Sequence, residues 1–154
     1  MEKISTFRGE YRFLSNFYQY PFEYKGLVYP NAEAAFQAQK CSTEEDKIKY
    51  TIQKNPVRAK QMGKKEPNLP PNWDTISYHI MNDILHAKFS IPNLAEKLKA
   101  TGNAYLVEEN HWHDNRWGKC TCEKCRQKDG LNWLGKILME IRKELNEKAS
   151  EHTV

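Results

Sequence analysis

The chain has 154 residues, of which 39% are hydrophobic and 29% charged, and its formal net charge is +4. This length suits one domain with a hydrophobic core, and the composition excludes an intrinsically disordered chain. The small positive charge favours anionic ligands and excludes the strongly basic profile of an architectural nucleic-acid-binding protein.

Short strands and turns are expected over the first 30 residues. The segment PFEYKGLVYP predicts a hairpin that turns at Lys25 and Gly26. Asn31 then caps a helix over AEAAFQAQK, which ends at Lys40. The next helix starts in STEEDKIKYTIQ, where Ser42 and Glu45 have the spacing of a capping box.

Further helices follow in the second half of the chain, and they are predicted over residues 55–63, 73–89, 92–102 and 133–148. A strand is predicted over 104–109, a loop over 110–131, and Asn132 as the cap of the last helix. Gly135, in the first turn of that helix, lets another group approach closely. The expected class is α+β, mainly helical: a single domain over 1–148 with a small sheet formed by the N-terminal strands and 104–109, followed by a flexible tail over 149–154.

The helix over 32–40 carries a carboxylate, an amide and an ammonium on one face. Glu33, Gln37 and Lys40 are spaced by four and three residues, which places them on the same side. A solvated helix face is the alternative explanation of these polar residues, but it does not explain the aromatic rings nearby. The preceding FLSNF segment adds Phe13 and Asn16, and aromatic rings beside a carboxylate suit the recognition of a flat heterocycle or a sugar.

The loop LVEENHWHDNRWGK (106–119) concentrates aromatic and charged side chains. Two tryptophans in one loop indicate packing on the core or on a ligand. Asp114 lies between them, and it is either part of a binding site or a turn residue, since Asp-Asn is a common turn pair.

Three of the four cysteines follow this loop in CTCEKC, at positions 120, 122 and 125. Cys120, Cys122 and Cys125 are spaced as zinc ligands, with the fourth ligand open among His111, His113 and Cys41. The alternative is a variable loop with reduced thiols. This spacing does not indicate a disulfide framework.

No apolar run approaches the roughly 18 residues of a membrane span, and MEKISTFRGE lacks the apolar region of a signal peptide. With reduced thiols, this predicts a cytoplasmic protein with no membrane partner.

Taken together and in order, six segments resemble the NADAR family, also called YbiA-like, from about Phe7 to Leu145. They are FLSNFYQYPF, YPNAEAAFQAQK, NPVRAKQMG, NWDTISYHIMNDILHAKF, LVEENHWHDNRWGK and NWLGKILMEIR. The resemblance implies a mainly helical α+β domain that hydrolyses N-glycosidic bonds. One branch of the family cleaves phosphoribosylamino-pyrimidine intermediates of riboflavin biosynthesis, and another removes ADP-ribose from guanine in nucleic acid.

By matching motif, the resemblance implies that Glu33 is a catalytic carboxylate and Asp114 its acidic partner. It implies pocket rings at Trp73 and Trp117 and a sugar or base contact at Asn16. The remaining candidates for substrate binding are Phe13, Gln37 and Asn132, with Lys40, Arg58, Lys88 and Arg116 as candidates for phosphate contacts.

The expected reaction needs these residue types. Breaking a C–N glycosidic bond builds positive charge on the ribose, which an ionised carboxylate stabilises, and a second acidic group protonates the leaving nitrogen or activates water. The two roles could be exchanged between Glu33 and Asp114. The reaction is expected to require no cofactor, and zinc is a candidate for a structural role only. CTCEKC stands where riboflavin-type members carry a Gly-rich segment, which favours removal of ADP-ribose from guanine in DNA; a phosphoribosyl substrate and a non-catalytic ADP-ribose-binding module are the alternatives.

Overall fold

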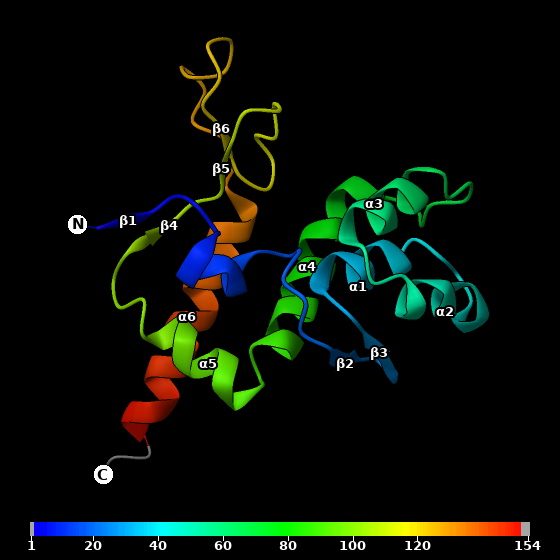
Figure 1. Cartoon of the computed structure of the whole chain (residues 1–154), viewed down its shortest axis with the longest axis horizontal. Helices are drawn as coiled ribbons and strands as arrows, with labels where there is room; N and C mark the ends of the chain where they lie inside the picture. The colour runs from blue at the N-terminus through cyan, green and yellow to red at the C-terminus, as the bar shows by residue number, and fades with distance from the viewer. Residues whose placement is uncertain (1, 152–154) are drawn as a thin grey trace. The chain divides into compact units, whose positions relative to one another are not determined.

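The computed structural model describes residues 2–151, in which short strands lie near both ends of a run of consecutive helices and a long helix ends the chain (Figure 1). The chain divides into two compact units. Unit 2 is the continuous segment Asn16–Ile91, and unit 1 combines the residues up to Ser15 with those from Pro92 onward. Each unit is described by itself.

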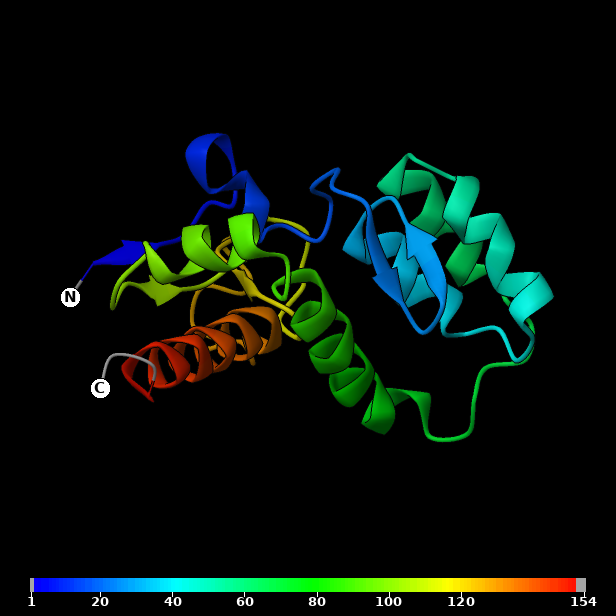
Figure 2. The ribbon, with the colours of Figure 1, turned by 90° about the horizontal axis from the view of Figure 1, so that it is seen from below.

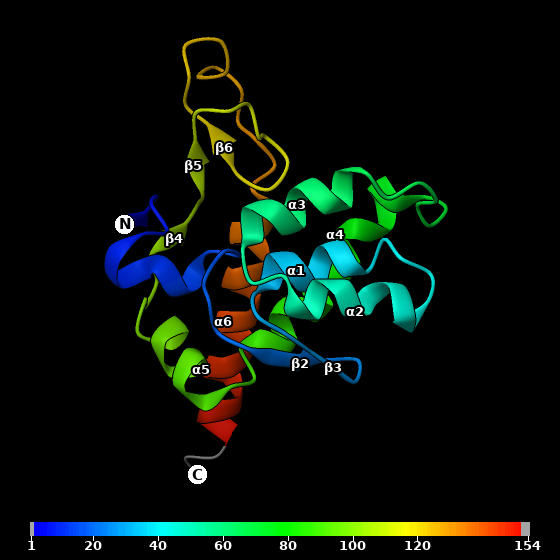
Figure 3. The ribbon, with the colours of Figure 1, turned by 45° about the vertical axis from the view of Figure 1, so that its right-hand side comes forward.

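Unit 2 is built around one short buried helix. Its elements are β2 (Phe22–Tyr24), β3 (Leu27–Tyr29), α1 (Ala32–Ala38), α2 (Glu44–Ile52), α3 (Pro56–Lys64) and α4 (Trp73–Lys88). Helix α1 contacts α2, α3 and α4, and Figure 3 shows it between α2 and α3. Every residue of α1 is buried, which explains its run of small alanines.

Strands β2 and β3 form the predicted hairpin, which is seen from another side in Figure 2. Phe22 pairs with Tyr29, and the turn residues Lys25 and Gly26 have positive φ angles of 49° and 87°. A two-residue hairpin turn of type I′ needs positive φ at both central positions, which glycine adopts without strain. The prediction is confirmed. The hairpin packs against α2 and α4.

The helix starts in unit 2 agree with the predicted caps in two cases of three. The Asn31 side chain accepts a hydrogen bond from the Ala34 N–H, and Asn55 accepts from the first turn of α3. The predicted capping box at Ser42 is wrong, because Thr43 is the cap and accepts from the Asp46 N–H. A threonine hydroxyl caps a helix as a serine does, so sequence alone did not separate the neighbours.

Unit 1 packs around the C-terminal helix. Its elements are β1 (Lys3–Ile4), the 3₁₀ helix η1 (Gly9–Leu14), α5 (Pro92–Lys99), β4 (Tyr105–Leu106), β5 (Glu109–Asn110), β6 (Lys119–Cys120) and α6 (Trp133–Glu151). Helix α5 and strand β4 both contact α6. The contact faces are apolar and fully buried, with Leu94, Leu98, Leu106, Leu134, Ile137 and Leu138 among them. Their burial is the main stabilising contribution to this unit.

The mainly helical α+β class is confirmed, but the predicted single small sheet is not. Within residues 2–151 the strands form three separate pairs: parallel β1–β4, antiparallel β2–β3 and parallel β5–β6. The predicted 104–109 strand is interrupted after Leu106 and yields both β4 and β5. Among the described residues the two hairpin strands pair with each other, and they pack against helices of unit 2.

Helix α6 continues to Glu151, so the first residues of the predicted 149–154 tail are helical. The rest of that tail, 152–154, lies outside the described residues. Within residues 2–151, no helix is both long enough and apolar enough to span a membrane.

Candidate active site

Glu33 lies in the first turn of α1, where the residue is only 8% exposed. The Asn31 cap fixes the helix start, and the Glu33 N–H donates to the Asn16 carbonyl oxygen over 3.0 Å. Asn16 of the FLSNF segment is therefore tied to the helix start, whereas Phe13 belongs to unit 1. A carboxylate that is buried loses its hydration, and other favourable interactions must replace it. The positive N-terminal end of the helix dipole supplies part of them.

Gln37 supplies another of these interactions. Its Nε2 donates to Glu33 Oε1 over 2.9 Å, and the side chain is 5% exposed. Its Oε1 has no hydrogen-bond partner among the described residues. The amide fits against Gly63, where a Cβ would come within 1.8 Å of Oε1. A buried acceptor without a partner is uncommon in proteins, and it is available to a ligand N–H or O–H group or to a water molecule.

Asn16 provides a second such acceptor in the same unit. Its Oδ1 is buried and without a hydrogen-bond partner in the described part of the chain, while Nδ2 makes a weak contact of 3.7 Å with Met81 Sδ. Glu33 is hydrogen-bonded to Asn16 through the backbone and to Gln37 through the side chains. Two residues that contact Glu33 therefore each have a buried acceptor without a partner among the described residues.

An aromatic ring and an amine lie beside the same helix. The Trp73 ring packs 5.3 Å from the Phe36 ring, and Lys40 Nζ lies 5.7 Å from the Trp73 ring centre. Burial lowers the pKa of Lys40, and the negative charge of Glu33 opposes this shift. The predicted set Glu33, Gln37, Lys40, Trp73 and Asn16 thus lies within unit 2, linked by these contacts.

Lys88, at the end of α4, is almost completely buried at 1% exposure. Its Nζ lies 5.1 Å from the Phe89 ring centre and 5.7 Å from that of Tyr18. Burial lowers the pKa of Lys88 to about 7. Lys88 was predicted as a candidate phosphate contact, and that role stays a prediction.

In unit 1, Asp114 shapes a turn in the loop between β5 and β6. Its Oδ1 accepts hydrogen bonds from the N–H groups of Arg116 (3.0 Å) and Trp117 (2.9 Å). The Asn110 side chain holds the Asp114 backbone in two ways. Its Oδ1 accepts from the Asp114 N–H over 3.1 Å, and its Nδ2 donates to the Asp114 carbonyl oxygen over 2.8 Å. Asp114 is thus the turn residue that the sequence allowed, and a turn role does not exclude a catalytic one.

The two tryptophans of the loop behave differently. Trp117 packs edge-on against Trp133 with ring centres 5.3 Å apart, and the Arg116 guanidinium lies 5.5 Å from the Trp133 ring. Trp112 is 58% exposed. Trp112 was one of the two loop tryptophans expected to pack on the core or on a ligand, whereas Trp133 was not predicted as a site residue.

Asn132 does not cap α6 through its side chain. Its Nδ2 donates to the Leu106 carbonyl oxygen (3.0 Å) and to the Tyr105 hydroxyl (3.2 Å), which joins α6 to β4. Its Oδ1 is buried and lacks a partner within the described residues. The close approach predicted at Gly135 is confirmed, because a Cβ there would lie 2.0 Å from the Leu106 carbonyl oxygen.

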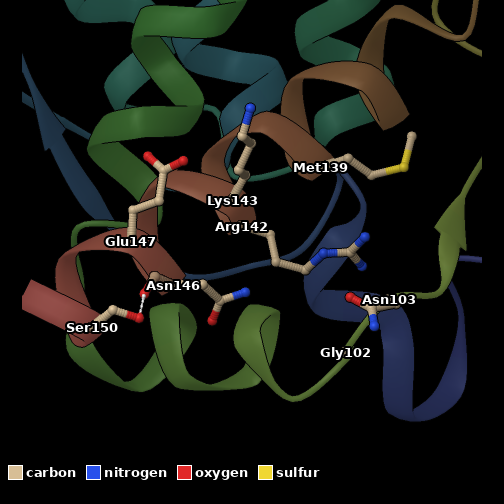
Figure 4. Close-up of a pocket in the computed structure, with 8 residues that line it drawn as sticks. All are labelled: Gly102, Asn103, Met139, Arg142, Lys143, Asn146, Glu147 and Ser150. Carbon is tan, nitrogen blue, oxygen red and sulfur yellow. Dashed lines mark hydrogen bonds between the residues drawn. The ribbon is translucent and has the colours of Figure 1, made fainter. Parts of the chain in front are cut away.

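Two other features of unit 1 are separate from these contacts. Phe13 is buried, with Lys97 Nζ 5.9 Å from its ring centre. A shallow hollow of about 310 Å³ lies along α6 (Figure 4), and the described residues that line it include none of the predicted site residues. Its Arg142 side chain already donates to the Thr101 hydroxyl over 2.9 Å.

Side chains of the types that bind metals gather in the part of unit 1 that follows β5. They are His113, Cys120, Cys122 and Cys125, whose ligand atoms all lie within 4.8 Å of one another. His111 instead contacts the Thr121 hydroxyl. Cys41 belongs to unit 2, and burial, followed by the nearby Glu66 carboxylate, raises the pKa of its thiol to about 11.

The sequence and the fold of this chain match those of known proteins. The NADAR domain matches residues 5–146, and the chain belongs to the NADAR family. One family domain therefore spans residues of both units.

The relatives of this chain include enzymes with named activities. It is 34% identical over 142 residues to "N-glycosidase YbiA" of Escherichia coli, covering 88% of this chain and 82% of that protein. It is 32% identical to "Riboflavin biosynthesis protein VVA0006" of Vibrio vulnificus over 92% of this chain and 38% of that longer protein. The NMR structure of Escherichia coli YbiA has the same fold, with a TM-score of 0.81 and 32% identity over all of this chain and 92% of that one.

Proposed function

We propose that this protein is a hydrolase that cleaves the N-glycosidic bond of a phosphorylated ribose, with ADP-ribosyl-guanine in DNA as its favoured substrate. Water adds to the ribose C1′, and the departing nitrogen takes up a proton. The products are free ADP-ribose and guanine in the DNA strand. The N-glycosidase names of its relatives support the class of reaction.

The observation that carries the proposal is the buried carboxylate of Glu33. Charge develops on the ribose ring as the C–N bond breaks, and an ionised carboxylate stabilises that charge most strongly where water is excluded. Glu33 is buried, lies at a helix start and is held by Gln37. Its environment therefore suits a carboxylate that is held in one orientation and shielded from water.

The groups around Glu33 suit the recognition of a nucleotide. The free acceptors of Gln37 and Asn16 can receive N–H or O–H groups of a base or a ribose. The Trp73 ring offers a face for a flat heterocycle, and the Lys40 amine offers a positive charge for a phosphate. All of these groups belong to unit 2.

The riboflavin-intermediate reaction is the second candidate, favoured by the name of the Vibrio vulnificus relative. The two candidates are separated by incubating the protein with DNA that carries ADP-ribosylated guanine and, in parallel, with the phosphoribosylamino-pyrimidine, and by detecting products by mass spectrometry. We expect release of ADP-ribose from the DNA. Release of product only from the pyrimidine would support the second candidate, and binding without any product would indicate an ADP-ribose-binding module.

The substitution Glu33→Gln tests the carboxylate. We expect the rate of hydrolysis to fall by a factor on the order of 10²–10⁴, because the charge that stabilises the transition state is lost. The amide can still accept from Gln37, so the melting temperature stays near that of the wild type. Glu45→Gln, at an exposed first-turn carboxylate of α2, is the matched control and keeps full activity. A fully active Glu33→Gln enzyme contradicts the mechanism.

The proposed acidic role of Asp114 is separated from its turn role by two substitutions. In Asp114→Asn the amide oxygen still accepts from the Arg116 and Trp117 N–H groups, so we expect lower activity with unchanged stability. Asp114→Ala loses the turn as well, and both activity and melting temperature fall. Equal activity of Asp114→Asn and the wild type would leave Asp114 with the turn role alone.

A further inference from the structure

We propose that the loop between β5 and α6 binds one zinc ion through three cysteine sulfurs and one histidine nitrogen. The ligands are His113 Nδ1 and the Sγ atoms of Cys120, Cys122 and Cys125, called here the Cys₃His cluster. The sequence left the fourth ligand open among three residues, and the structure assigns it to His113.

The distances within the Cys₃His cluster fit tetrahedral zinc. Zn–S bonds of about 2.3 Å and Zn–N bonds of about 2.0 Å place sulfur and nitrogen about 3.5 Å apart in a tetrahedral site. His113 Nδ1 lies 3.3 Å from Cys125 Sγ, 3.4 Å from Cys122 Sγ and 3.9 Å from Cys120 Sγ. A fully protein-ligated tetrahedron leaves no open position, as is typical of a structural zinc site rather than a catalytic one.

The backbone of the loop brings the four ligands together. His113 has a positive φ of 69°, which turns its ring onto the sulfurs, and its N–H donates to Cys120 Sγ over 3.3 Å. A turn after Cys122 returns the chain, with the Cys125 N–H donating to the Cys122 carbonyl oxygen.

The Lys119 and Asn115 side chains hold the backbone around the cluster. Lys119 Nζ donates to the carbonyl oxygens of Cys120 (3.1 Å) and Cys125 (2.9 Å). Three thiolates and one zinc ion carry a net charge of −1 with a neutral histidine, and the lysine ammonium is a favourable neighbour for it. The Asn115 side chain accepts from the Cys120 N–H, which ties the cluster to the Asp114 turn.

The zinc ion would hold the Asp114 turn in place. His113 directly precedes Asp114, and Cys120 lies beyond the turn in β6, so the metal closes the loop that carries Asp114. This consequence rests on the proposed function of Asp114, whereas metal binding does not. Loss of zinc is then expected to lower both the stability of the loop and the rate of hydrolysis.

The metal itself is measured first. Tag-free protein purified under reducing conditions is analysed for zinc by mass spectrometry of the elements, and we expect about one zinc ion per chain. His113→Ala and Cys125→Ser lower the zinc content, whereas the controls His111→Ala and Cys41→Ser keep it. Absence of zinc from the wild-type protein, also after reconstitution with zinc, would overturn the proposal, and so would equal loss in His111→Ala and His113→Ala.

Two measurements on the wild-type chain remain informative if a variant fails to fold. Replacement of zinc by cobalt(II) gives the visible absorption of a tetrahedral thiolate site, and an octahedral spectrum contradicts the Cys₃His ligand set. Removal of zinc with a strong chelator exposes the three thiols to a thiol reagent and lowers the melting temperature. An inactive protein that still binds zinc would contradict the proposed enzymatic function but not the metal site.

Discussion

Among single residues, Lys88 differs most from what its residue type suggests. A lysine on a helix is normally exposed and charged, yet the Lys88 amine is buried beside the Tyr18 and Phe89 rings. Burial lowers its pKa to about 7, because the charged form loses its hydration. The folded protein therefore releases this proton several pH units below the unfolded chain, in which a lysine has a pKa of about 10.4.

The shift makes stability depend on pH. Between pH 7 and about 10 the unfolded chain holds the Lys88 proton and the folded protein does not, so the free energy of unfolding rises with pH by up to about 1.4 kcal/mol per unit. As pH falls towards 7 this contribution is lost. We expect Lys88→Met to remove the rise, measured as the difference from wild type in urea unfolding at pH 7, 8 and 9.

The control for this experiment is Lys97→Met, which removes an exposed lysine that also lies over a ring. Its difference from the wild type should stay constant with pH. Parallel stability profiles of Lys88→Met and the wild type would show that the Lys88 amine keeps its ordinary proton affinity in the folded protein.

Among the elements, the contact between β4 and α6 depends on one residue without a side chain. The Leu106 carbonyl oxygen approaches Gly135 so closely that a Cβ would lie 2.0 Å away, and the Asn132 amide fills the remaining space. Asn132 also donates to this carbonyl oxygen. The start of α6 is therefore fixed to the strand by a hydrogen bond and by close packing at once.

Gly135→Ala should separate these two elements. Because the clash involves backbone rather than a flexible side chain, we expect a loss of about 1–3 kcal/mol in the free energy of unfolding. The corresponding decrease in melting temperature is roughly 3–10 °C for a chain of this size. Lys136→Ala, at the exposed neighbouring position of α6, is the control and should have little effect. Equal melting temperatures of Gly135→Ala and the wild type would show that β4 can move away without cost.

At the scale of the whole molecule, the ordered motifs and the periodicity predicted the family and the helices, because turn chemistry and helix starts are local properties. Lys25 and Gly26 specify their hairpin turn by conformation, and Asn31 and Asn55 specify helix starts by hydrogen bonding. The family assignment and the α+β class are confirmed. The roles of the site residues stay predictions.

The properties that could not be predicted depend on how deeply a side chain is buried and on the direction in which it points. Helical spacing does not show that Lys88 is buried, and the sequence therefore predicted it only as a candidate for a phosphate contact. The choice between His111 and His113 as metal ligand depends on which ring turns towards the sulfurs. The side chain of Asn132 binds β4 rather than the helix start, because the acceptor that it finds lies 26 residues away in sequence.

The exposed Trp112 is adjacent to His113, the proposed zinc ligand, and its indole is accessible to solvent. The other three tryptophans are less exposed, so added iodide or acrylamide would quench the emission of Trp112 preferentially. The chain thus contains an intrinsic fluorophore beside the loop that carries Asp114, and a change in the order of this loop can be followed optically without labelling.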